Sequence, residues 1–165
     1  MAIADAMLME MDMEEKTTQR VLERIPENKL TWKPHPKAYS LGQLAMHIAV
    51  AQGRVATAAV EDVHEFGPTA PPEPKNRQEI MDAFAASNAK AKQVVKSFDD
   101  ARMTSIWTLK KNGKVVMSVP RVAFLRAIMM NHIYHHRGQL SVYIKLLDLP
   151  VPSIYGPSAD ENPFN

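Results

Sequence analysis

Cysteine is absent from the 165-residue chain. This absence excludes disulfides, thiolate metal sites, CxxC redox chemistry and a nucleophilic thiol of the protein's own, so any thiol chemistry requires a thiol cosubstrate. A basic tract is absent too, because the 20 basic and 18 acidic residues are mixed along the sequence and leave a formal charge of +2. Without a basic stripe to follow a phosphate backbone, nucleic acid is not an expected partner.

Long apolar runs are also missing. The N-terminal stretch MAIADAMLMEMDMEEK is interrupted by Asp5, Glu10 and Asp12, so it does not match a secretory signal. No run elsewhere approaches the roughly 20 apolar residues that span a bilayer. We therefore expect a cytoplasmic protein with no membrane partner. A chain of this length can bury about two-thirds of its unfolded surface, and residues 1–165 are expected to form a single domain.

Apolar spacings and capping signals predict four long helices. They cover about residues 4–24, 41–65, 77–98 and 121–147. The second helix starts at Ser40, which has Gln43 at the spacing of a capping box. The third starts at Asn76, with Glu79 at the same spacing. The pattern predicts an all-α fold, a four-helix bundle, in which functional sites are built from side chains on facing helices.

Two further segments contain residues that favour turns or break helices. Asn112-Gly113 lies between two β-favouring runs and predicts a two-stranded hairpin before the last helix. The segment 148–165 contains four prolines and should lie extended over the surface as a tail. Within it, Tyr155 is expected to anchor the tail to the bundle or to roof the functional site.

Three of the six histidines occur in the stretch HIYHHRGQ at residues 132–139. At about 100° per residue, His132 and His136 fall in the middle of the apolar stripe of the last helix, and His135 falls at its edge. Imidazoles four residues apart lie one turn apart on the same face and can converge on one ion, as in helical HExxH zinc sites. Burial of their nitrogens without partners is unfavourable, and metal coordination would remove that cost.

A third ligand is available in the second predicted helix. His47 lies there on an apolar stripe, whereas His35 in a proline-rich loop and His64 near the predicted helix end should be solvated. A lone inward histidine is more often a hydrogen-bonded core residue than a ligand. Together with the HxxxH pair, we interpret His47 as a ligand. Three imidazoles suit zinc or nickel, with iron and manganese as further candidates, and leave at least one coordination position open.

Other polar residues of the last helix have two interpretations each. Gln139 and Tyr143 are predicted to point inward, where Gln139 could orient water or substrate or bond a facing helix. Tyr143 could fill the core or form a pocket wall.

Arg137 falls about 140° from His132, off the predicted core face, which favours a surface or dimer contact. In the N-terminal helix, Glu14 is expected on a solvated acidic face, and the methionines there predict an adaptable core or dimer face.

Three segments together resemble a known family. They are WKPHPKAYSLGQLAMHI at 32–48, NHIYHHRGQL at 131–140 and PSIYGPSADE at 152–161. The resemblance is to DinB-like proteins, part of a superfamily that includes bacillithiol-transferase-like proteins, and it covers nearly the whole chain. It implies an up-down-down-up four-helix bundle, often a homodimer, with one divalent metal held by three histidines. The matching positions are His47, His132 and His136, while His135 remains a neighbour that hydrogen-bonds, faces a partner subunit or has no catalytic role.

The resemblance leaves three hypotheses for function. Superfamily members include metal-dependent thiol transferases and a thiol-dependent isomerase, and the family name refers to induction by DNA damage, not to action on DNA. The first hypothesis is an enzyme that activates a low-molecular-weight thiol or water for transfer to, or hydrolysis of, a small molecule. It predicts an open coordination position at the base of a cleft. The others are a non-catalytic metal-binding or stress-related binding protein, and an interaction module whose histidines bind nothing.

Overall fold

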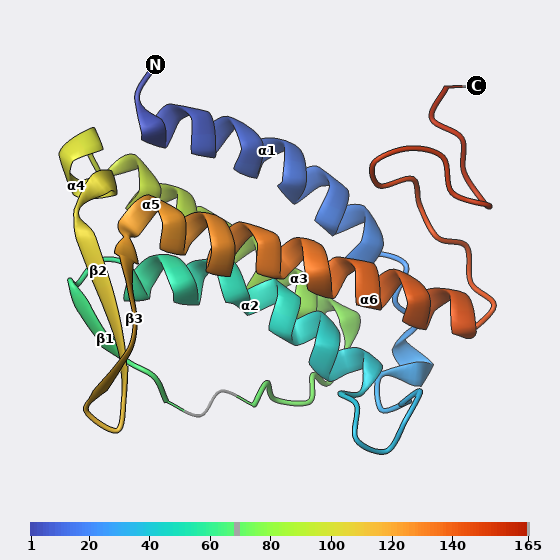
Figure 1. Ribbon diagram of the computed structural model, residues 1–165. Coiled ribbons are helices and arrows are strands. Elements are labelled where there is room, and N and C mark those ends of the chain that lie inside the picture. Colours follow the sequence, from blue (N-terminus) through green and yellow to red (C-terminus); the bar gives the residue numbers. More distant parts are fainter. Residues whose placement is uncertain (68–69, 165) are drawn as a thin grey trace.

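The computed structural model describes residues 1–67 and 70–164, so residue 165, the last of the predicted tail, lies outside the described residues. The fold is mostly helical with a small three-stranded sheet (Figure 1). The helices are α1 (Ile3–Leu22), η1 (Glu27–Lys29), α2 (Leu41–Ala58), α3 (Arg77–Lys96), α4 (Asp100–Thr104), α5 (Arg121–Phe124), η2 (Leu125–Asn131) and α6 (His132–Leu146). The strands are β1 (Val63–Glu65), β2 (Ile106–Lys111) and β3 (Lys114–Pro120). Helix α2 packs on α3 and α6, and α1 packs on α3 and α6.

The predicted starts of α2 and α3 are confirmed. The Ser40 hydroxyl accepts from the Gln43 backbone N–H at 3.0 Å, and Gln43 Oε1 accepts from the Ser40 N–H at 3.1 Å. The Asn76 side chain accepts from the Glu79 N–H at 2.8 Å. Each cap satisfies N–H groups that have no partner inside the helix. The first cap fixes the start of α2 and so places His47 two turns into it.

Helix α2 ends earlier than predicted, and this prediction was wrong. The chain leaves the helix after Ala58 and forms β1, which pairs in parallel with β2. The buried guanidinium of Arg121 donates to the Ala59 carbonyl at 2.7 Å and to Asp62 Oδ1 at 2.6 Å. These bonds hold the turn that follows α2, where carbonyl groups at a helix end need partners. Strand β2 and Arg121, which hold this segment in place, are both distant from it in the sequence.

The hairpin before the last helix is confirmed, although the sheet has three strands and not two. Strands β2 and β3 pair antiparallel across Asn112 and Gly113, whose φ values are 52° and 74°. Asparagine and glycine tolerate this left-handed region, as the turn requires. Trp107 of β2 is fully buried and stacks on Phe124 with ring centroids 3.6 Å apart. The sheet therefore packs against the start of the last helix.

The last long helix changes its winding just before the histidines. In η2 the hydrogen bonds run from residue i to i+5, so each residue advances through a smaller angle than in an α-helix. A uniform helical wheel is therefore out of phase across this segment. The buried residues of α6 are Ile133, Arg137, Leu140 and Ile144. They centre about 110° from His132, so the prediction that His132 and His136 lie mid-core was wrong: both are half-buried, on the flank that faces α2.

The expectation that Arg137 and Glu14 lie on the surface was also wrong. Arg137 is 1% exposed and Glu14 is 8% exposed. Arg137 donates to Glu14 Oε2 at 2.6 Å, to Thr18 Oγ1 at 3.0 Å and to the Tyr155 hydroxyl at 2.6 Å. Its guanidinium carbon also lies 5.0 Å from the Tyr155 ring centroid, within cation–π range. This cluster joins α1, α6 and the tail, and Tyr155, although 70% exposed, anchors the tail as expected through its hydroxyl.

Candidate metal centre

Three histidine rings from two helices meet at one point. His47 lies on α2, and His132 and His136 lie on the first two turns of α6. The Nε2 atom of His132 is 3.3 Å from Nε2 of His47 and 2.9 Å from Nε2 of His136. The three ring pairs have centroids 4.3 to 4.9 Å apart and are nearly perpendicular, at 85 to 88°. The structure therefore brings together the three histidines predicted as ligands.

The nitrogen separations suit a small divalent ion. Zn–N bonds of 2.0–2.1 Å in tetrahedral geometry place two ligand nitrogens about 3.3 Å apart. One nitrogen of each ring lies within 4.8 Å of the others, and the cluster holds no carboxylate. His132 Nδ1 is buried with no hydrogen-bond partner in the described part of the chain. The polar neighbours of the His132 ring are thus the other two imidazoles, an arrangement that a shared cation would stabilise.

Burial keeps these rings in the form that binds metals. Desolvation, followed by the charges of neighbouring histidines, lowers the pKa of His47 and of His132 to about 4. The pKa of His136 is lowered as well, mainly by burial. All three rings are therefore neutral near pH 7, and a neutral imidazole offers a lone pair to a metal.

Gln139 supports His136 from outside the cluster. Its side-chain oxygen lies 2.7 Å from His136 Nδ1, and since an amide oxygen only accepts, Nδ1 carries the proton. The lone pair of His136 is then on Nε2, which faces His132. Histidines that bind metals commonly donate their second nitrogen in this way, which fixes the tautomer and the ring orientation. Gln139 itself is exposed, so its expected inward position was wrong.

Tyr143 does not reach the cluster directly. It is half-buried, meets Trp32 edge-on with centroids 5.7 Å apart, and donates to the Tyr39 carbonyl at 3.4 Å. Tyr39 in turn lies beside His47, with ring centroids 5.9 Å apart. Tyr143 therefore has the first of its two expected roles, that of a packed side chain and not of a pocket wall. It holds the loop before α2 next to His47.

The other three histidines lie outside the cluster. His35 is exposed, as expected, and His135 is exposed with its ring 4.9 Å from that of His136. His64 was expected to be solvated, but it is half-buried and stacks on Trp107 at a centroid distance of 6.4 Å. The 100° step between neighbouring helix residues explains why His135 points away from the site while His136 points into it.

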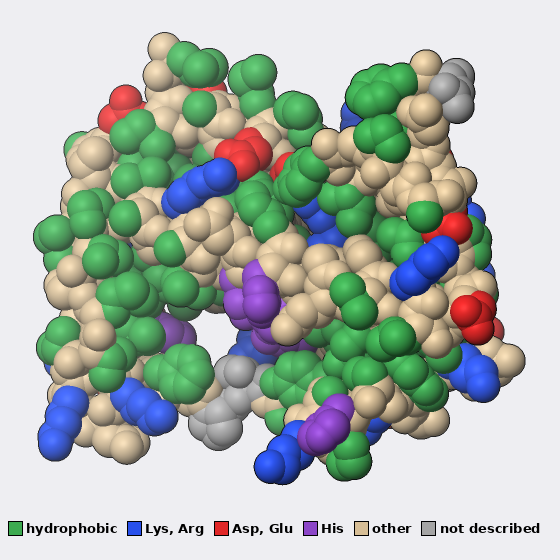
Figure 2. Space-filling model, turned by 45° about the vertical axis from the view of Figure 1, so that its right-hand side comes forward, with side chains coloured by type: hydrophobic (Ala, Val, Ile, Leu, Met, Phe, Trp, Pro, Cys, Tyr) green, Lys and Arg blue, Asp and Glu red, His purple; other side chains and the backbone are tan. Residues whose placement is uncertain are grey.

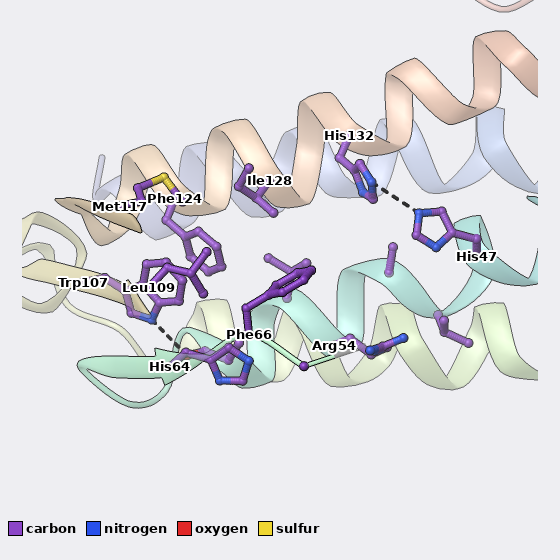
Figure 3. A pocket seen from close by; sticks show the side chains of 15 residues that line it. His47, Arg54, His64, Phe66, Trp107, Leu109, Met117, Phe124, Ile128 and His132 are labelled. Carbon is purple, nitrogen blue, oxygen red and sulfur yellow. Dashed lines mark hydrogen bonds between the residues drawn. The ribbon is translucent and has the colours of Figure 1, made fainter. Parts of the chain in front are cut away.

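A cavity of about 360 Å³ adjoins the cluster, between α2, the last helix and the sheet (Figure 3). His47 and His132 lie at one end of it, and His64 and Trp107 lie toward the other. Figure 2 shows histidine side chains at the edge of a hollow in this face of the molecule. The enzyme hypothesis predicted a cleft beside the histidines, but the residues that form its walls, including Arg54 and those of the sheet, were not predicted. The seven-residue spacing from His47 to Arg54 on α2 was the one available signal, because the other walls come from distant segments.

Comparisons with known proteins agree with the fold and show the family. Residues 10–140 match the family model of the DinB superfamily. The chain is also 27% identical over 162 residues to an uncharacterized protein, YrdA, of Bacillus subtilis strain 168, covering 95% of this chain and 90% of that protein. The chain therefore belongs to the DinB superfamily.

Two solved structures share the fold. A DinB-like protein from Bacillus cereus ATCC 10987 superimposes with a TM-score of 0.75 at 24% identity, covering 93% of this chain and 98% of that chain. A DinB-like protein of Bacillus subtilis, YjoA, gives a TM-score of 0.65 at 18% identity, covering 87% and 94%. Among the described helices, none has both the length and the hydrophobicity needed to cross a membrane.

Replacement of Gln139 by alanine is expected to weaken zinc binding by about 10- to 100-fold, because the His136 tautomer and ring orientation are no longer fixed. Isothermal titration with zinc measures the change. The matched control is Ser141→Ala, two residues further along α6, whose hydroxyl donates to the Arg137 carbonyl at 2.9 Å. Equal zinc affinities for Gln139→Ala and the wild type would show that Gln139 does not act on the site.

Proposed function

We propose that this protein is a metal-dependent enzyme in which His47, His132 and His136 hold one divalent ion, with zinc or nickel the leading candidates and iron or manganese the alternatives. The observation that supports this proposal is the convergence of three neutral imidazoles beside a cavity that can admit a small molecule. Three protein ligands leave a coordination position for an exogenous ligand, which is the pattern of catalytic sites. When bound, such an ion acts as a Lewis acid and lowers the pKa of a coordinated water or thiol.

The reaction class we propose is transfer of a thiol to a small molecule, or hydrolysis of one. Because the chain has no cysteine, the thiol would be a low-molecular-weight cosubstrate. The protein residues have three tasks in this scheme: the histidines hold the ion, Gln139 orients His136, and the apolar cavity walls exclude water and position the substrate. Among the residues described, no carboxylate lines the cavity to act as a general base.

The finer features that the family resemblance implies are proposals as well. We propose that the four long helices form an up-down-down-up bundle and that the protein is a cytoplasmic homodimer. Exposed methionines on α1, Met9 at 61% and Met13 at 70%, support an apolar contact face on that helix. We propose no membrane or nucleic-acid partner, in keeping with the mixed charge of the chain.

The test compares metal-loaded and metal-free protein. Protein loaded with zinc or with nickel is assayed with glutathione and a panel of aryl halides and epoxides, and separately with a panel of esters. Turnover is expected in the loaded samples, and its loss is expected after chelation and in His132→Ala. In the same samples, metal at 100 times its dissociation constant should stabilise the fold by about 2.7 kcal/mol. Stabilisation without turnover in any assay would favour the non-catalytic metal-binding protein.

A further inference from the structure

The cavity next to the histidines is largely aromatic and aliphatic. Trp107 and Phe124 stack at 15° to each other on one wall, and Phe66, 49% exposed, lies across from Ile128 (Figure 3). Sites for small molecules span about 300–1,000 Å³, and this cavity of about 360 Å³ is near the lower limit. A molecule with one ring and a short chain fits such a space, and aromatic walls favour a ring through stacked or edge contacts.

One cation faces this apolar space. Arg54 lines the cavity, and no Asp or Glu of the described chain does. Among the described residues, the exposed Arg54 side chain makes no ion pair or hydrogen bond, and it also lines a second hollow whose wall includes Glu61. A guanidinium has five donors in a planar fork that matches a carboxylate in two-point geometry. Arg54 is therefore available to an anionic group brought in by a ligand.

The position of Arg54 relative to the metal centre sets the ligand's length. His47 and Arg54 are seven residues apart on α2, so they share one face with their Cα atoms separated by two turns, about 10 Å along the axis. Val50 and Ala51 fill the interval and line the same cavity. A ligand in the cavity can therefore contact Arg54 with one end and the three histidines with the other.

We propose that the cavity binds a small aromatic carboxylic acid, with the ring against Phe66 and Ile128, in front of the buried Trp107 and Phe124, and the carboxylate on Arg54. The inference rests on the proposed function, because it names the substrate class of that same site. The part of the molecule that points to His47 and His132 would hold the reacting group. The recognition is by charge and shape at Arg54 and the aromatic wall, and it does not require coordination of the carboxylate to an ion.

The test uses phenylpropionate as the probe and phenylpropanol as its neutral counterpart, titrated calorimetrically into zinc-treated protein whose zinc content is measured on the same sample. Phenylpropionate is expected to bind at least about tenfold more tightly than the alcohol, since a charge-assisted hydrogen bond contributes about 1.5–3 kcal/mol. Arg54→Gln should remove this difference while leaving the weak binding of the alcohol unchanged. Lys96→Gln, which removes an exposed cation from α3, is the matched control and should behave as the wild type.

The outcomes separate this inference from the proposed function. Acid binding that is unchanged in Arg54→Gln would overturn the inference, because the carboxylate would then bind elsewhere, including at an ion. Ala58→Phe places a ring in the cavity remote from the histidines, so it should abolish acid binding and keep the zinc content. Zinc binding without acid binding overturns the inference and leaves the proposed function standing. Acid binding that depends on Arg54 in protein that holds no zinc supports the acid site and overturns the metal-dependent function.

Discussion

Replacement of His132 by alanine is expected to lower zinc affinity by more than about 100-fold. His132 is the middle ring of the cluster, with its Nε2 atom 3.3 Å from that of His47 and 2.9 Å from that of His136. Loss of a residue that only orients a ligand costs about 10- to 100-fold in metal affinity, so loss of a ligand itself should exceed that range. Competition with a chromophoric zinc indicator measures the change.

The matched variants are His47→Ala and His135→Ala. His47→Ala should cause a loss similar to that of His132→Ala, because the site needs a ligand from α2 as well as the pair on α6. His135→Ala should retain the wild-type affinity, since His135 is exposed and outside the cluster. Retention of zinc by His47→Ala, together with loss of zinc in His135→Ala, would show that the metal is bound by the histidines of α6 alone. The site shared by α2 and α6 would then be wrong.

Replacement of Arg137 by methionine is expected to lower the free energy of unfolding by about 3–5 kcal/mol, the range for removal of one partner from a buried ion pair. Arg137 is 1% exposed and bonds Glu14, which the substitution would leave buried without its cation. The hydrogen bond from Arg137 to the Tyr155 hydroxyl would also be lost, so that Tyr155 would keep only its bond to Glu14 among the contacts of this cluster. Urea unfolding of metal-free protein, followed by circular dichroism, measures the effect.

The chain provides a matched control in the other ion pair between the last helix and α1. Arg126 bonds Glu10 at 2.5 Å, but the side chains are 46% and 38% exposed. Arg126→Met should therefore lower the free energy of unfolding by no more than about 1 kcal/mol. The double variant Arg137→Met/Glu14→Leu should recover part of the loss, because no buried charge is left unpaired. Equal small effects of Arg126→Met and Arg137→Met would contradict the structural role assigned to the buried pair.

The parts of the fold that local chemistry determines could be predicted from the sequence. The capping box at Ser40 and the N-cap at Asn76 involve residues three apart, and the hairpin turn depends on Asn112 and Gly113 alone. The long helices follow from apolar spacing within each segment. The convergence of His47, His132 and His136 could also be predicted, because histidine spacing on a helix is local and because the family resemblance aligned His47 with the pair on the last helix.

The features that sequence reasoning missed depend on long-range contacts or on a change of helix geometry. Strand β1 forms because β2 is there to pair with it and Arg121 holds the preceding turn. The π-helical segment η2 shifts the phase of every residue before His132, and a uniform wheel therefore assigned the wrong face to the core. Arg137 was placed at the surface for this reason, although its side chain is buried against Glu14. π-Helical segments are rare and often occur at functional sites, which fits a segment that ends at a proposed metal ligand.

The most direct test of the three-histidine centre is X-ray absorption spectroscopy of untagged protein loaded with one equivalent of zinc. The account predicts zinc bound by three imidazole nitrogens at about 2.0–2.1 Å, with the remaining position taken by an oxygen, or by sulfur when a thiol is added. It also predicts that one imidazole is lost from the spectrum of His47→Ala. A spectrum with fewer than three imidazoles in the wild type, or with no change in His47→Ala, would contradict a metal centre shared by α2 and α6.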